Sequence, residues 1–267
     1  MSANPMRLKR ALIKFARYGL RRPFIRIMGR PLKGYRWTTS RAYEYLLGTH
    51  ESPETIDRFL SWLDADSVFY DVGANVGYFS FVASTVVTRG RILAFEPMQP
   101  NLRLFEEHLR LNRHRTGVNT ITLLPYAVAD REKTVEFTNH PQLTGSNTYV
   151  DSQFLGADVE RVTVTCCSID GLVAEGNPAP TAIKIDVEGA EFDVLQGAER
   201  TIRDHLPRIL LATHDIHLPG VDQKCREFLE SLGYQLTHTG AFNHRMDGLS
   251  DYIAMHPAKL AASRAAA

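Results

Sequence analysis

The chain has 267 residues, of which 44% are apolar and 23% are charged, as in an ordinary globular protein. No uncharged apolar run reaches the roughly 18 residues that a bilayer-spanning helix needs, so we expect no transmembrane segment and no secretory signal of the usual form. The cysteines lack the spacing of a metal site, and we expect reduced thiols in a cytoplasmic protein. They are Cys166, Cys167 and Cys225.

The net charge of +1 hides a strong asymmetry along the chain. Residues 1–36 hold 11 of the 31 Lys and Arg and no Asp or Glu, which leaves 20 basic and 30 acidic residues for the remainder. This separation predicts a basic segment attached to an acidic body. The predicted parts are a basic N-terminal arm and linker at 1–42, a main domain at 43–257 and an Ala-rich tail at 258–267.

The basic arm has the pattern of a surface-binding segment. Residues 7–21 carry a basic and an apolar stripe at helical spacing, and Gly29, Pro31 and Gly34 indicate an irregular linker after them. We expect residues 7–36 to contact an anionic membrane surface, peripherally at the inner membrane face. Packing on the acidic body, in the same chain or in a homo-oligomer, is the alternative. No nucleic-acid partner is expected, because the body is acidic and no recognisable module is present.

The main domain alternates strand and helix patterns. Alternation of this kind predicts an α/β fold in which a mostly parallel sheet carries helices on both faces. The last two strands have no helix between them, which predicts a C-terminal antiparallel hairpin. Strands are predicted at 67–72, 91–96, 120–124, 134–137, 162–167, 181–187, 208–213, 234–238 and 251–256. Helices are predicted at 53–64 with Ser52 as the cap, at about 77–87, at 100–112, from 190 and at 221–232.

The stretch DVGANVGYFS (71–80) follows a strand and opens a helix. Gly73 and Gly77 remove side chains at this turn, so a ligand can approach the backbone and the helix N-terminus. Glu96 ends the next strand, where an acid accepts hydrogen bonds from ribose hydroxyls. These features indicate an adenosine cofactor, either NAD or S-adenosylmethionine. Asp71 favours the second, because a carboxylate is awkward beside a pyrophosphate but suits the amino group of a methionine.

Four motifs in this order resemble the FkbM family of S-adenosylmethionine-dependent methyltransferases: DVGANVGYFS, AFEPMQPN, YAVAD and IKIDVEGAEFDVLQGA. The resemblance covers roughly residues 43–235, and it implies a class I (Rossmann-like) methyltransferase with a seven-stranded sheet. It also implies O-methylation of a sugar, a glycosylated natural product or a glycolipid. An NAD-dependent oxidoreductase is the second interpretation. The cofactor-binding residues implied by the motifs are Asp71, Gly73, Ala74, Asn75, Gly77, Tyr78, Glu96, Pro97, Asn101, Ala127, Asp130 and Asp186.

Within this resemblance the turn residues would hold the methionine part of the cofactor. Glu96 would hold the ribose, and Ala127 with Asp130 would lie near the adenine. The family usually has an acid two positions before the histidine that follows the strand at 208–213. Here that position is Ala212 and the histidine is His214.

The predicted catalytic groups end two neighbouring strands. We expect His214 to act as general base towards the acceptor hydroxyl, held by Asp186 or Glu188, with a rate that rises between about pH 5.5 and 7.5. A second mechanism places Mg²⁺ on Asp186, His214 and Asp215. The long polar segment at 139–158 is predicted to be a loop that covers the substrate.

Overall fold

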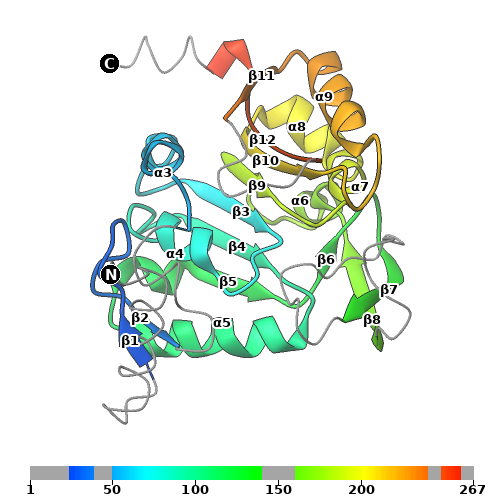
Figure 1. The fold of residues 1–267 in the computed structure, drawn as a ribbon. Coiled ribbons are helices and arrows are strands. Elements are labelled where there is room, and N and C mark those ends of the chain that lie inside the picture. The colour runs from blue at the N-terminus through cyan, green and yellow to red at the C-terminus, as the bar shows by residue number, and fades with distance from the viewer. Residues whose placement is uncertain (1–23, 39–49, 140–159, 240–247, 260–267) are drawn as a thin grey trace, which may run out of the picture.

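The computed structural model describes residues 24–38, 50–139, 160–239 and 248–259, and its main feature is a seven-stranded sheet (Figure 1). The strand order is β11-β12-β10-β9-β3-β4-β5, and β12 is the one strand of this sheet that runs antiparallel to its neighbours. The predicted parallel sheet with a closing hairpin is therefore confirmed. The strands are β3 (Val68–Val72), β4 (Arg91–Phe95), β5 (Ile121–Leu124), β9 (Ala182–Ile185), β10 (Arg208–His214), β11 (Gln235–His238) and β12 (Leu249–Met255).

Helices cover both faces of this sheet because successive strand residues point to opposite sides. Phe69 and Ile92 pack in the cluster that includes α3, α4 and α5, whereas their neighbours Tyr70 and Leu93 pack in the cluster that includes α6 to α9. The helices are α3 (Pro53–Leu60), α4 (Tyr78–Ala83), α5 (Gln99–Asn112), α6 (Ile169–Ala174), α7 (Glu191–Gln196), α8 (Glu199–His205) and α9 (Val221–Ser231).

The helix starts agree better with the sequence pattern than the helix ends do. The Ser52 hydroxyl accepts a hydrogen bond from the Thr55 amide at 2.8 Å, which confirms the predicted cap of α3. This helix ends at Leu60 and α4 ends at Ala83, both earlier than expected. Among the described residues, no helix combines the length and the apolar character that crossing a membrane requires.

The predicted irregular segment at Gly29, Pro31 and Gly34 has no regular secondary structure, but it is the loop of a packed hairpin. Residues 24–38 form this antiparallel hairpin of β1 (Phe24–Arg26) and β2 (Arg36–Thr38) that lies beside α5 (Figure 1). Trp37 is 2% exposed and stacks on the ring of His108, with 3.7 Å between centroids. The Asn112 side chain exchanges two 2.8 Å hydrogen bonds with the backbone of Arg36. This part of the arm therefore belongs to the packed core.

A second, three-stranded sheet has the order β6-β8-β7. It consists of β6 (Ala127–Val128), β7 (Lys133–Asn139) and β8 (Glu160–Cys167). The predicted strands at 134–137 and 162–167 are thus confirmed, but they pair with each other and lie outside the main sheet. The predicted helix at 7–21, the loop at 140–158 and the tail after 259 lie outside the described residues.

Candidate active site

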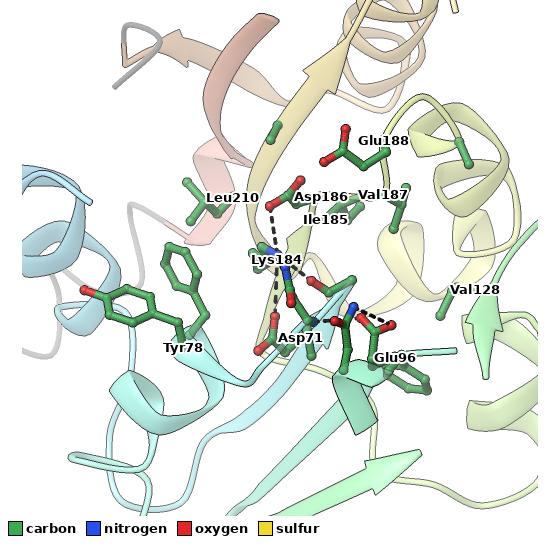
Figure 2. A pocket seen from close by; sticks show the side chains of 18 of the residues that line it. Asp71, Tyr78, Glu96, Val128, Lys184, Ile185, Asp186, Val187, Glu188 and Leu210 are labelled. Carbon is green, nitrogen blue, oxygen red and sulfur yellow. Dashed lines mark hydrogen bonds and ion pairs between the residues drawn. The ribbon is translucent and has the colours of Figure 1, made fainter. Parts of the chain in front are cut away.

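A cavity of about 350 Å³ lies at the carboxyl ends of β3, β4, β9 and β10, the edge where open α/β sheets bind ligands. Figure 2 shows part of its lining, with Lys184 between Asp71 and Asp186. All of the predicted cofactor-binding residues line the cavity except Gly77 and Asp130, and so do the predicted catalytic residues Glu188 and His214.

The two glycines of the turn serve the fold more than a ligand. Both have positive φ, +76° at Gly73 and +93° at Gly77, where a side chain is strained. A Cβ at Gly73 would lie 1.9 Å from the carbonyl oxygen of Asp186, and one at Gly77 would lie 2.5 Å from the ring of Phe105. Gly73 still lines the cavity as expected, although protein atoms fill the space that a side chain there would take, and only the expectation for Gly77 is not supported. Gly77 does not line the cavity.

Asp71 is completely buried at the end of β3. Its Oδ2 accepts a 2.6 Å hydrogen bond from the Ser80 hydroxyl, while Oδ1 accepts none from the described residues. Burial raises the pKa of the Asp71 carboxyl, although the nearby Lys184 charge opposes the shift. An incompletely satisfied buried carboxylate of this kind favours a cationic partner.

Lys184 lies beside Asp71 and was not identified from the sequence. Its Nζ donates a 3.0 Å hydrogen bond to the Gly73 carbonyl, and it lies 3.1 Å from Asp186 Oδ2 and 3.8 Å from Asp71 Oδ1. Burial alone would lower the pKa of Lys184, but the charges of Asp186 and Asp71 outweigh it and raise the pKa. A lysine in the middle of the apolar β9 pattern was the available signal, since a charge in a buried strand requires partners.

Glu96 ends β4 and is held by the chain around it. Its Oε2 accepts the Asn75 amide at 2.9 Å, and its Oε1 accepts the Met98 amide at 2.8 Å and the Asn101 side chain at 3.2 Å. Burial raises the pKa of Glu96 to about 7, and these hydrogen bonds only partly offset the shift. The carboxylate therefore has a defined orientation at the cavity wall, as expected of a group that binds ribose hydroxyls.

Of the two residues expected near the adenine, one lines the cavity and the other does not. Ala127 lines the cavity, as does the partly exposed Tyr126 beside it. Asp130 does not line it, because its carboxylate pairs with Lys133 and Arg131, each at 2.6 Å. The contribution of Asp130 to the cofactor site stays a prediction.

A polar cluster lies where β9 and β10 end. His214 Nε2 is 3.6 Å from Asp186 Oδ1 and 3.7 Å from Glu188 Oε2, so the predicted catalytic residues do come together. The hydrogen bond that orients the ring comes from a different residue. His214 Nδ1 lies 2.7 Å from Oε1 of Glu191, which is completely buried. Glu191 therefore replaces Asp186 and Glu188 as the group that holds the ring.

The electrostatics of His214 do not agree with its predicted role as the base. Burial would lower the pKa of His214, but the hydrogen bond to Glu191 and the charges of the surrounding carboxylates outweigh burial and raise the pKa to about 10. At neutral pH the ring in this arrangement is protonated, and a protonated imidazole has no lone pair for a hydroxyl proton. The expected rise in rate between about pH 5.5 and 7.5 is therefore not supported.

Asp215 lies outside the cluster, contrary to the prediction that it could complete a metal site. Its Oδ1 accepts a 2.7 Å hydrogen bond from the Asp222 amide in the first turn of α9. Of the described residues, Asp186, Glu188 and His214 form the group whose ligand atoms lie within 4.8 Å of one another.

Three further residues near the cavity were given no role in the sequence prediction, although Glu191 belongs to the motif IKIDVEGAEFDVLQGA. Glu191 lies in the helix that follows DVEGA, and His217 lies one turn after His214, with Nε2 2.9 Å from Glu188 Oε2. Glu51 lines the cavity, and burial together with the charges of Asp251 and Asp186 raises its pKa to about 8. Glutamates and histidines after a strand are common, so no local pattern distinguished these residues.

Known proteins resemble this chain over most of the sheet. The family model for the FkbM methyltransferase domain matches residues 71–236, more than half of the chain. The methyltransferase sdnD of Sordaria araneosa is 27% identical over 206 residues, which cover 67% of this chain and 78% of that protein. The hexuronic acid methyltransferase AglP of Haloferax volcanii is 27% identical over 172 residues, 64% of each chain.

Two further known proteins are longer than this chain, which matches only a part of each. The AMB antimetabolite synthetase AmbE of Pseudomonas aeruginosa is 28% identical over 225 residues, 73% of this chain and 10% of AmbE. The crystal structure of methyltransferase FkbM from Methylobacillus flagellatus superposes with a TM-score of 0.52 and 20% identity, covering 73% of this chain and 44% of that chain. The likeness to this structure shows the Rossmann-like methyltransferase fold.

Proposed function

Because the chain belongs to the FkbM methyltransferase family, we propose that it transfers the methyl group of S-adenosylmethionine to a hydroxyl of a sugar, a glycosylated natural product or a glycolipid. The observation that carries the choice of cofactor is the charge of the cavity lining. Among the described residues that line the cavity, the cationic groups are Lys184 and the protonated His214, against six acids: Glu51, Asp71, Glu96, Asp186, Glu188 and Asp251.

This lining suits a sulfonium cofactor and disfavours a dinucleotide. A pyrophosphate carries two negative charges and is normally met by backbone N–H groups or by basic side chains. Here the one lining lysine already pairs with Asp71 and Asp186. S-adenosylmethionine carries a positive sulfur, a positive amino group and one carboxylate, and this net positive charge gains from a surplus of carboxylates in the lining. The NAD-dependent oxidoreductase is therefore not favoured.

In the proposed arrangement the adenosine end of the cofactor lies at Glu96, with the ribose hydroxyls donating to its carboxylate. The methionine end lies towards Asp71 and the turn after β3. The acceptor hydroxyl lies near Asp186 and His214, on the neighbouring strand ends. Holding the two reactants in line supplies a large part of the rate gain in a transfer of this kind.

The acceptor class is supported by a relative and by the surface of the N-terminal hairpin. The name of AglP says that it methylates a hexuronic acid, which favours a sugar acceptor here. The hairpin exposes Arg26, Arg30 and Lys33, and Met28 between them is 62% exposed. Basic side chains around an apolar one suit an anionic bilayer surface, which favours a lipid-linked acceptor and a peripheral position at the inner membrane face.

Calorimetric titration with S-adenosylhomocysteine and with NAD tests the choice of cofactor. The proposal expects binding of S-adenosylhomocysteine and none of NAD, and the reverse result would exclude it. Transfer of a labelled methyl group to a panel of sugars and glycolipids then identifies the acceptor. For any variant that loses a carboxylate of the cavity, the matched control is Glu132→Gln, on the exposed surface away from the cavity.

A further inference from the structure

Three side chains at the ends of β9 and β10 have the arrangement of metal ligands. We propose that Asp186, Glu188 and His214 bind a divalent first-row transition metal ion, with Mn²⁺ as the representative. Their ligand atoms lie within 4.8 Å of one another, and His214 Nε2 is 3.6 and 3.7 Å from the two carboxylates. The two separations from His214 Nε2 suit a shared ion at about 2.0–2.2 Å from the nitrogen and from each carboxylate oxygen.

His214 is oriented as a ligand. The ring is 6% exposed, and Glu191 accepts the Nδ1 proton at 2.7 Å. The other nitrogen, Nε2, points into the cluster and makes no hydrogen bond within the described parts of the chain. The ion would take the place of the proton that this nitrogen carries in the ion-free protein. A carboxylate that holds one ring nitrogen while the other faces outward is the usual environment of a metal-binding histidine. Glu191 is thus a positioning residue for the proposed site.

Each of the two carboxylates also has a second partner, on the other oxygen in Asp186 and on the ligand oxygen itself, Oε2, in Glu188. Lys184 Nζ lies 3.1 Å from Oδ2 of Asp186, which leaves the Oδ1 atom directed at His214. His217 Nε2 lies 2.9 Å from Glu188 Oε2. Outer partners that fix each ligand lower the entropy cost of assembling a site.

The backbone at Glu188 supports the same interpretation. Glu188 has φ +55° and Gly189 has φ +103°, and a non-glycine residue in this region costs of order 1 kcal/mol or more. The Gly189 amide donates to Oε1 of Glu191 at 2.9 Å, so the strained turn and the positioning residue are joined. In the proposed site, this strained turn brings the Glu188 carboxylate to the other two ligands.

The charge and the donor types favour a transition ion. Asp186, Glu188 and Glu191 bring three carboxylates to this region, and Lys184 is the basic side chain that offsets them. Oxygen donors alone suit Mg²⁺ and Ca²⁺, whereas a mixed set with an imidazole favours ions such as Mn²⁺, Fe²⁺ or Zn²⁺. Three protein ligands leave coordination positions open, and the Asp186 side chain, 38% exposed, faces the cavity.

The role of the ion rests on the proposed methyl transfer. An acceptor hydroxyl bound to the ion becomes more acidic and releases its proton to water. A lone pair of that oxygen then attacks the methyl carbon of the sulfonium. The carbon–sulfur bond breaks, its electron pair stays on sulfur, and the products are the methyl ether and the neutral thioether.

Electron paramagnetic resonance of Mn²⁺ tests the site without cofactor or acceptor. The full chain, freed of metal with EDTA, is titrated with Mn²⁺ while the sharp signal of the free aqueous ion is followed. We expect a single bound ion per chain, and weaker binding by at least about tenfold in Asp186→Asn and Glu188→Gln. Asp215→Asn is the matched control, because Asp215 is adjacent in sequence but faces α9, and it should bind Mn²⁺ as the unmodified chain does.

Each outcome decides one statement. Absence of bound Mn²⁺, or equal binding by the two ligand variants and the unmodified chain, would refute the site and leave a protonated His214 as the partner of the carboxylates. The amide variants keep the size of the side chains, and cooperative thermal unfolding establishes that they fold. Binding of S-adenosylhomocysteine is measured separately. If Mn²⁺ binds but S-adenosylhomocysteine does not, the metal site stands and its role in methyl transfer is refuted. If S-adenosylhomocysteine binds but Mn²⁺ does not, only the metal site is refuted.

Discussion

Glu96 provides a quantitative test of the cofactor site through its pKa. The carboxyl titrates at about 7 because it is buried, compared with about 4.3 for an ordinary Glu. In the proposed complex two ribose hydroxyls donate to the carboxylate, so the bound state requires the ionised form. Below pH 7, part of the binding free energy must therefore remove a proton from Glu96.

The magnitude follows from this linkage. Each pH unit below the pKa costs about 1.4 kcal/mol, or tenfold in the dissociation constant. Between pH 8 and pH 5.5 the affinity for S-adenosylhomocysteine should fall roughly 30-fold on this basis. In Glu96→Gln the position has no proton to lose, so its contribution to the pH dependence disappears. The variant should also bind about 2 kcal/mol more weakly at pH 8, because hydrogen bonds to a charged acceptor are replaced by neutral ones.

Isothermal titration at several pH values between 8 and 5.5 measures both effects. The comparison of the unmodified chain with Glu96→Gln isolates Glu96 from other titrating groups in the cavity, such as Glu51. An affinity that stays constant over this range would refute the reasoning. The same slope in the variant and in the unmodified chain would also refute it, since the titration would then belong to another group.

Three further predictions concern the fold and its surface. Gly77→Ala should lower the free energy of unfolding in urea by about 2 kcal/mol or more, since the new Cβ would meet Phe105 at 2.5 Å. Gly220→Ala is the control: Gly220 has a similar φ but nothing within 4 Å of the added Cβ, so this variant should cost about 1 kcal/mol. Burial lowers the pKa of His108 to about 4, so below about pH 6.5 the unfolded chain binds more protons than the folded one. The free energy of unfolding should therefore fall by up to about 3 kcal/mol as the pH reaches 4. The dependence of this free energy on pH should flatten in His108→Gln, and an unchanged dependence would contradict the assignment to His108. Replacing Arg26, Arg30 and Lys33 together by alanine should weaken binding to anionic vesicles at low salt by about 1 kcal/mol per charge, as measured by vesicle flotation. Equal flotation of the variant and the unmodified chain would show that the hairpin does not contact the membrane.

The sequence by itself determined the architecture of the main sheet. Its signal is local, because apolar runs such as RILAF and AIKI are long enough to form buried parallel strands and the segments between them have helical periodicity. The turn after β3, the acid at the end of β4 and the polar residues after β9 and β10 were placed at one edge by the same reasoning, since the carboxyl ends of parallel strands meet there. The hairpin around the irregular segment was not predicted, because Gly29, Pro31 and Gly34 indicate turns but do not reveal that Trp37 packs on α5.

Only the tertiary structure decided which groups act on one another. Gly73 and Gly77 have positive φ as their pattern suggests, but the atoms that exclude a side chain belong to Asp186 and Phe105, far away in sequence. The partner of His214 is Glu191, 23 residues earlier. The elevated pKa of His214 arises from Asp186, Glu188 and Glu191, a short stretch after β9 that the fold brings to the end of β10. Asp215 and Asp130 carry the expected charge but face other partners. Direction and burial of a side chain depend on the packing of distant segments, and no local pattern encodes them.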